Sequence, residues 1–172
     1  MPMLAINANE ATAMGLYDAA RLFKFEVESS ENLRFIPLVV RYNLDRFGLR
    51  ITLDQWQMLP YDDRVLLARF PVEADREIEP NFDRAVDEML RTHAKVEPEK
   101  FAPDADPVWA HADAVPETVI RQSSLAGVSS PSLSRWAELD PFQRYALAKL
   151  ARRTGELNHD FLPAMREFGL AD

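Results

Sequence analysis

The chain contains no cysteine and only five glycines among its 172 residues. The absence of cysteine excludes disulfides, a thiolate nucleophile, cysteine-ligated zinc and cysteine-held iron–sulfur clusters. The glycines form no GxGxxG, GxxxxGK[ST] or GxSxG motif, which argues against dinucleotide binding, P-loop chemistry and a nucleophile-elbow hydrolase. The three histidines, His93, His111 and His159, have no HExxH or other metal-ligand spacing. The sequence therefore predicts no catalytic residue, no metal and no cofactor.

Positive charge and long apolar runs are also scarce. Lysine and arginine number 20 against 28 acidic residues, which gives a net charge of −8. Such acidity argues against non-specific nucleic-acid binding. No apolar run is long enough to span a bilayer, and the first residues, MPMLAINANE, lack the regions of a secretory signal. We therefore expect a cytoplasmic protein that folds as a single domain over residues 1–172.

One sixteen-residue pattern occurs twice in the chain. Leu53, Trp56, Leu59, Arg64, Leu67 and Ala68 recur with the same spacing as Leu133, Trp136, Leu139, Arg144, Leu147 and Ala148. Average residue frequencies would give about one identity in such a window. Similarity of this length is typical of a supersecondary unit used twice. We predict a first repeat at about 33–93, a linker at about 94–113 and a second repeat at about 114–170.

Capping signals divide both repeats into helices. Thr52 and Ser132 are placed to cap the short helices that carry the repeated tryptophans, and Asp140 precedes a proline in the manner of a helix start. Gly48 is placed to end the preceding helix. A single repeat would leave a tryptophan-bearing apolar face in water. The predicted fold is therefore all-α, with about eight helices in two pseudo-repeated halves packed on one shared core.

The segment before the first repeat shows a different pattern. Residues Phe23 to Glu28, FKFEVE, alternate apolar and charged side chains, which is typical of a strand. Because no ladder partner is evident, we expect an extended arm packed on helices through Phe23 and Phe25. A short helix is expected from Glu10 to Leu22.

Several arginines are candidates for a binding surface. Arg34 and Arg41 flank the start of the first repeat helix, and Arg152 and Arg153 form a basic spot in an acidic chain. Ordinary surface ion pairs would account for them, and contact with an acidic partner is the functional alternative. Trp109 is a candidate aromatic hot spot in the linker. With one histidine added, the candidate partner-binding residues are Arg34, Arg41, Trp109, Arg152, Arg153 and His159.

Two residue pairs leave alternatives open. His159 and Asp160 stand at a helix start, where they serve either as a structural cap or as a general-base pair. Arg64 and Arg144 occupy one repeat position, so we expect each to make the same structural contact to a helix C-terminus. The second functional alternative is a small-molecule binder or enzyme that uses a cleft between the two halves, with His159, Asp160 and Arg152 converging there.

A set of motifs in constant order resembles the nitrate reductase associated protein family. The motifs are FKFE from Phe23, LRFIPLVVR ending at Arg41, LDRFG ending at Gly48, LDQW ending at Trp56, the repeat of this tryptophan at Trp136, and NHDFLPA to FGL over 158–170. The resemblance covers about residues 22 to 170. Taken together the motifs are fairly specific, whereas any one of them alone would not be.

The resemblance implies an accessory protein of assimilatory nitrate reduction in cyanobacteria and other bacteria. Such proteins are thought to support the activity or maturation of nitrate reductase, a molybdenum and iron–sulfur enzyme. The family has no established catalytic residues, so we expect a non-enzymatic protein that binds nitrate reductase or its maturation machinery. Family members often carry cysteine where this chain has Phe35 and Phe47. A thiol-based redox or metal-delivery role is therefore not expected.

Overall fold

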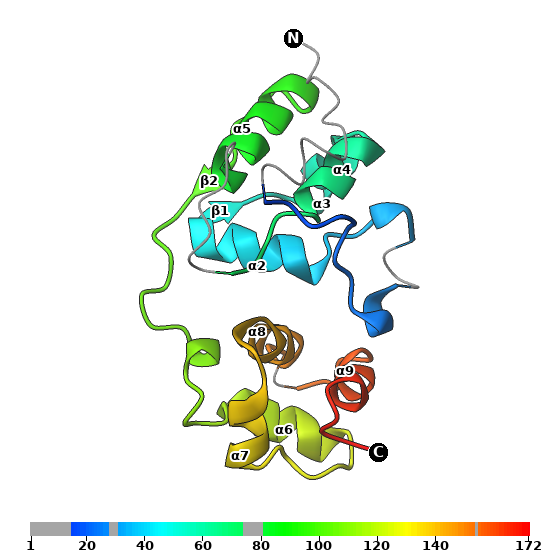
Figure 1. Cartoon of the computed structure of the whole chain (residues 1–172), viewed down its shortest axis with the longest axis vertical. Coiled ribbons are helices and arrows are strands. Elements are labelled where there is room, and N and C mark those ends of the chain that lie inside the picture. The colour runs from blue at the N-terminus through cyan, green and yellow to red at the C-terminus, as the bar shows by residue number, and fades with distance from the viewer. Residues whose placement is uncertain (1–14, 28–30, 74–80, 154) are drawn as a thin grey trace. The chain divides into compact units, whose positions relative to one another are not determined.

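The computed structural model describes residues 15–27, 31–73, 81–153 and 155–172. Within these residues the chain is mostly helical, with eight α-helices, three short 3₁₀ helices and one two-stranded sheet (Figure 1). The predicted helical class is confirmed, and the small sheet is an addition to it. No helix in the described part of the chain is both long and apolar enough to cross a membrane.

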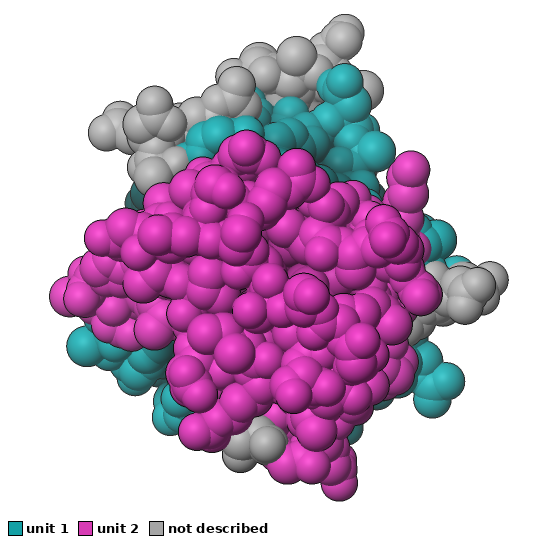
Figure 2. Space-filling view, turned by 90° about the horizontal axis from the view of Figure 1, so that it is seen from below, with its two compact units in different colours: residues 1–23, 27–103 teal, residues 24–26, 104–172 magenta. Residues whose placement is uncertain are grey.

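The chain divides into two compact units (Figure 2). Unit 1 is residues 1–23 and 27–103, and unit 2 is residues 24–26 and 104–172. The boundary at 103 falls inside the predicted linker. That linker is not without structure, because it contains β2 (Glu99–Lys100) and the 3₁₀ helix η3 (Val108–Ala110). The predicted packing of both halves on one shared core stays a prediction.

Unit 1 is built on four α-helices and the small sheet. In chain order its elements are η2 (Glu31–Leu33), α2 (Leu38–Phe47), β1 (Leu49–Arg50), α3 (Leu53–Met58), α4 (Tyr61–Leu67), α5 (Phe82–His93) and β2. The two strands are antiparallel, with Leu49 opposite Lys100. Helix α5 contacts both α2 and α4. It buries the helical stripe expected of a core-facing helix, formed by Phe82, Ala85, Val86, Met89 and Leu90.

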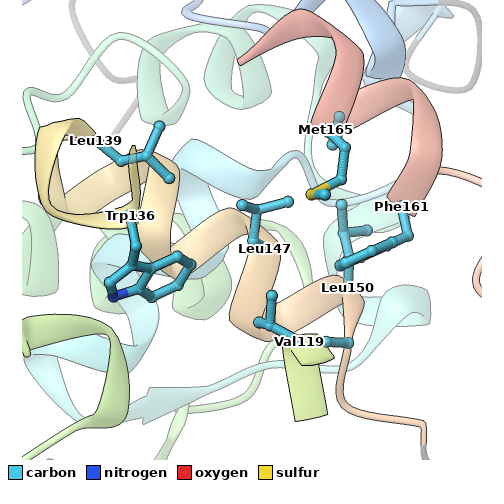
Figure 3. Packing of buried hydrophobic residues seen from close by; sticks show 9 residues of the cluster. Val119, Trp136, Leu139, Leu147, Leu150, Phe161 and Met165 are labelled. Carbon is cyan, nitrogen blue, oxygen red and sulfur yellow. The ribbon is translucent and has the colours of Figure 1, made fainter. Parts of the chain in front are cut away.

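Unit 2 has its own hydrophobic core. Its elements are η1 (Lys24–Glu26), η3, α6 (Glu117–Leu125), α7 (Leu133–Glu138), α8 (Pro141–Leu150) and α9 (Phe161–Glu167). Figure 3 shows Val119, Trp136, Leu147, Phe161 and Met165 converging from the four α-helices. All five are fully buried. The apolar periodicity of these helices therefore closes a core within this unit.

Local capping chemistry sets the helix starts in both units. Thr52 accepts a hydrogen bond from the Gln55 backbone N–H at 3.1 Å, and Asp140 accepts one from that of Gln143 at 2.8 Å. Both caps are closed by the glutamine side chain, which bonds back to the cap residue. Ser132 caps α7 in the simpler form. The predicted caps are confirmed, as is Gly48 at the end of α2.

Both units use a buried tryptophan in the same way. The indole N–H of Trp56 donates to the carbonyl of Leu33 at 2.8 Å. The indole N–H of Trp136 donates to the carbonyl of His111 at 2.9 Å. In each case the acceptor ends or directly follows a 3₁₀ helix, and four described α-helices of the same unit come after it in the chain. These contacts agree with the sequence match between the two segments.

The expected extended form of the arm and the expected N-terminal helix are wrong where the structure describes them, whereas the predicted packing of Phe25 on helices is confirmed. Residues 24–26 form the 3₁₀ helix η1 instead of an extended strand. The N–H of Phe25 donates to Glu167 at 2.9 Å, and its ring packs edge-on against Phe168 at 6.1 Å. Glu26 is buried, so the alternating pattern does not mark one wet and one dry face. Residues 15–22 are not helical, and residues 10–14 lie outside the described residues.

Candidate functional site

The connection between α8 and α9 presents three of the six candidate residues. Arg152 and Arg153 follow the end of α8 directly and are exposed. The side chain of His159 is 88% exposed, with its Nε2 3.5 Å from Asp160 Oδ1. Asp160 stands at the N-cap position of α9, but its side chain accepts no cap hydrogen bond. Its backbone N–H donates to Asn158 Oδ1 at 2.9 Å. The His159–Asp160 pair therefore does not cap α9 through a side chain, and the predicted structural cap is wrong.

Gln122 of α6 holds this connection in place. Its side chain is fully buried, and its Nε2 donates to the carbonyls of Arg153 at 2.7 Å and Glu156 at 2.8 Å. Its Oε1 accepts the backbone N–H of Asn158 at 3.0 Å. Both the NH₂ group and the carbonyl oxygen of this amide thus bond to the backbone of one loop. Sequence reasoning missed this residue.

A signal for Gln122 was present in the repeat. Asn43 lies 79 positions earlier, at the spacing that relates Pro37 to Pro116. Asn43 is also fully buried, and its Nδ2 donates to the Pro71 carbonyl at 3.4 Å, in the segment after α4. An amide at the same repeat position, on an otherwise apolar helix face, indicates a buried side chain that satisfies loop backbone.

Arg34 and Arg41 lie together at the start of α2 in unit 1. Arg34 is exposed, and its backbone carbonyl accepts a hydrogen bond from Gln57 at 3.1 Å. Arg41 is half-buried, and its Nε donates to the Ile36 carbonyl at 2.9 Å. This second guanidinium therefore also braces the chain that leads into α2.

Trp109 is a half-buried residue of η3. Its ring packs edge-on against Tyr145 of α8 with centroids 5.8 Å apart. Its carbonyl accepts a hydrogen bond from Arg144 Nε at 2.8 Å. In unit 1, Arg64 Nη1 donates at 2.9 Å to the carbonyl of Leu33, the last residue of η2. Arg144 Nη1 also donates at 2.5 Å to the carbonyl of Leu139, the C-cap residue of α7, so the expected contact to a helix C-terminus is confirmed for both repeated arginines.

Two acids and a histidine of unit 1 form a separate electrostatic feature. Asp63, in the first turn of α4, lies 3.1 Å from His93 in the last turn of α5. The Asp63 side chain is only 14% exposed. Burial raises the pKa of Asp63 above its ordinary value, while His93 opposes the shift and neighbouring Asp62 adds to it. The N-terminus of α4 favours negative charge, which Asp63 supplies, and the C-terminus of α5 favours a basic residue such as His93.

A cavity of about 460 Å³ lies in unit 1 beside the sheet. Its wall combines the ring of Phe47 with Asp83 and Asp87 of α5 and with Lys100 of β2. One oxygen of Asp83 is buried and has no hydrogen-bond partner among the described residues. Asp87 is engaged with Arg91 at 2.8 Å. None of the six candidate residues lines this cavity.

The fold and these sites define a small helical protein with an exposed loop in unit 2, which carries Arg152, Arg153 and His159 together with Glu156 and Asp160. Its described residues contain no group of three or more histidine or acidic side chains placed to hold a metal ion. A family model of conserved nitrate reductase-associated proteins matches residues 22–168, and the chain belongs to this family. The resemblance predicted from the sequence motifs is confirmed. Searches of curated proteins and of solved structures gave no match.

The family description associates the chain with nitrate reductase, which suggests a protein partner. Five of the six candidate residues fall into two local groups, one in each unit. Arg152, Arg153 and His159 share one loop of unit 2, and Arg34 and Arg41 share one segment of unit 1. Trp109 and Arg41 each have a structural contact, so the exposed members of the two groups are the stronger candidates for binding.

Proposed function

We propose that this chain is a non-enzymatic accessory or maturation protein of assimilatory nitrate reductase, and that it acts by binding another protein. Membership of the nitrate reductase-associated family over residues 22–168 carries the proposal. The partner is nitrate reductase itself or a protein of its maturation machinery. A cytoplasmic location is part of the proposal, and the lack of cysteine in the whole chain agrees with it.

The binding residues we propose are the exposed cations rather than an enclosed pocket. Arg34, Arg152 and Arg153 are exposed, and so is the side chain of His159. Exposed arginines suit recognition of carboxylates, because the guanidinium donates two parallel hydrogen bonds. An imidazole that is 88% exposed suits a contact surface better than a general base, which works inside a site that excludes water.

The proposal includes a duplicated scaffold that folds as one domain over residues 1–172. The common order of a 3₁₀ helix and four α-helices supports it. So do the matched hydrogen bonds of Trp56 and Trp136. In this reading the repeated residues serve the scaffold, and binding depends on positions where the two repeats differ.

Affinity capture from the natural host tests the proposed function. The full chain, tagged at one end, is expressed in cells grown on nitrate, captured under native conditions and analysed by mass spectrometry. Nitrate reductase or a protein that assembles its cofactors should be enriched over capture with the tag alone. Recovery of neither from nitrate-grown cells would contradict the proposal.

The cavity of unit 1 favours a second candidate function, the binding of a small polar molecule. Its wall includes the acidic residues Asp83 and Asp87 and the basic residues Arg84 and Lys100. Paired groups of opposite charge suit a zwitterion such as a free amino acid. Thermal unfolding in the presence of the common amino acids tests this function. A rise in Tm that Asp83→Asn removes would support it, and unchanged Tm values throughout would reject it.

A further inference from the structure

The backbone of residues 153, 156 and 158, in the connection that follows α8, is held by hydrogen bonds although Arg153 and Glu156 are exposed. Gln122 fixes it through three hydrogen bonds of 2.7 to 3.0 Å to backbone groups of residues 153, 156 and 158. The amide is fully buried, so water does not compete for these bonds. A loop fixed in this way loses little conformational freedom when a partner binds to it.

The same connection displays two guanidinium groups, those of Arg152 and Arg153, that are without a partner in the part of the chain that the structure describes. Among residues 15–27, 31–73, 81–153 and 155–172, no side chain forms a hydrogen bond or ion pair with the guanidinium of Arg152 or Arg153. Leu157, in the same loop, is 44% exposed. Exposed arginine and leucine side chains in one loop provide charge recognition and apolar contact area together. Glu156, also exposed, lies between Arg153 and Leu157 in the sequence and carries the opposite charge.

We propose that Arg152, Arg153, Leu157 and His159 form the docking surface for the protein partner, and that the partner presents an acidic segment to it. We call these four residues the docking loop. The inference rests on the proposed function and adds to it the place and the chemistry of binding. Gln122 is a positioning residue, because it acts by holding the loop backbone.

The charge of the whole chain favours an acidic protein segment over nucleic acid. A net charge of −8 repels a long polyanion, whereas two neighbouring guanidinium groups match a short run of aspartate or glutamate side chains. The same net charge would weaken approach of an acidic partner elsewhere on the chain. The docking loop therefore directs the encounter as well as contributing to affinity.

The experiment measures binding of the full chain to purified nitrate reductase of the same host, by biolayer interferometry at low and moderate salt. The test variant is Arg152→Glu/Arg153→Glu. The matched control is Arg91→Glu/Arg121→Glu, which changes net charge equally at side chains that are 55% and 56% exposed and already ion-paired. We expect the test variant to lose about tenfold or more in affinity and most of its salt dependence. The control should stay within about threefold of the natural chain.

A second pair of variants tests the positioning role. Gln122→Leu should weaken binding while the helical circular dichroism persists, and should speed amide hydrogen exchange at residue 158. Asn43→Leu makes the same kind of change at a buried amide of unit 1 and should leave binding unchanged. Equal losses of binding in both variants would show a general loss of structure and overturn the role of Gln122.

The outcomes separate the two proposals. If the natural chain binds and the two charge-reversal variants bind alike, the docking loop is wrong and the proposed function stands. If the test variant alone loses binding, the docking loop is supported. If the natural chain binds neither nitrate reductase nor any of its cofactor-assembly proteins, the proposed function fails, and the docking loop fails with it.

Discussion

Replacement of Gly48 by alanine should destabilise the chain more than the same replacement at a glycine where the added Cβ would meet no other atom. Gly48 has a φ of 70°, in the left-handed region, where a Cβ costs about 1–2 kcal/mol. A Cβ there would also lie well inside van der Waals contact of the Phe101 carbonyl oxygen. That approach belongs to the sheet, because the Phe101 N–H donates to the Gly48 carbonyl at 2.9 Å. To make room the two strands must separate, which loses this bond at a cost of about 1 kcal/mol.

Gly127→Ala is the matched control for Gly48→Ala. Gly127 has a φ of 72°, and a Cβ at this position would meet no atom within 4 Å. It therefore carries the backbone cost alone, about 1–2 kcal/mol, against about 2–3 kcal/mol for Gly48→Ala. Urea unfolding followed by far-ultraviolet circular dichroism measures both values from the shift in midpoint. Equal costs in the two variants would refute the steric role assigned to the strand contact.

Three further predictions concern buried polar groups. Because burial raises the pKa of Asp63, the folded chain holds this proton more tightly than the unfolded chain, so stability falls as pH rises from the ordinary value of about 3.9 through the raised one. Asp63→Asn should therefore gain stability relative to the natural chain between pH 3.5 and pH 7, and a pH-independent difference in urea unfolding would contradict this. Gln122→Leu should cost about 2–4 kcal/mol by urea unfolding, since three backbone groups lose their partner; a cost below about 1 kcal/mol would show that water replaces the amide. Trp56→Phe and Trp136→Phe should each cost about 1–3 kcal/mol by thermal unfolding, because each leaves a carbonyl without its indole donor, and a neutral result for either would show that its hydrogen bond adds nothing.

Helix positions followed from the sequence because their signals are local. Thr52 and Asp140 each lie three residues before a glutamine that closes the cap, so both partners are visible in one window. The paired strands could not be found in this way. Each has two residues, and Leu49 meets Lys100 only after α5 has packed on α2. The prediction of an extended segment at Phe25 was wrong for a similar reason, because its partner Glu167 lies 142 positions away in the sequence.

The candidate site could be predicted in part for the same reason. The sequence identified Arg152, Arg153 and His159 as residues of a segment where the two repeats differ, and the structure places them in one loop. It could not show that Arg41 is engaged by a carbonyl, because that depends on how the chain enters α2. Gln122 was missed since its three partners lie 31 to 36 residues away.

The contact between Phe25 and Glu167 has a consequence for synthesis on the ribosome. The two residues are 142 positions apart, and the ring of Phe25 covers part of the core of unit 2. At about 5–20 residues per second, the ribosome makes Phe25 roughly 7–28 seconds before its partner. Residues 24–26 must therefore wait, while the helices of unit 1 are already complete. Unit 2 can complete this contact only after residue 167 has been made. A nascent chain stalled before residue 167 would therefore leave the aromatic side chain of Phe25 accessible to chaperones and proteases.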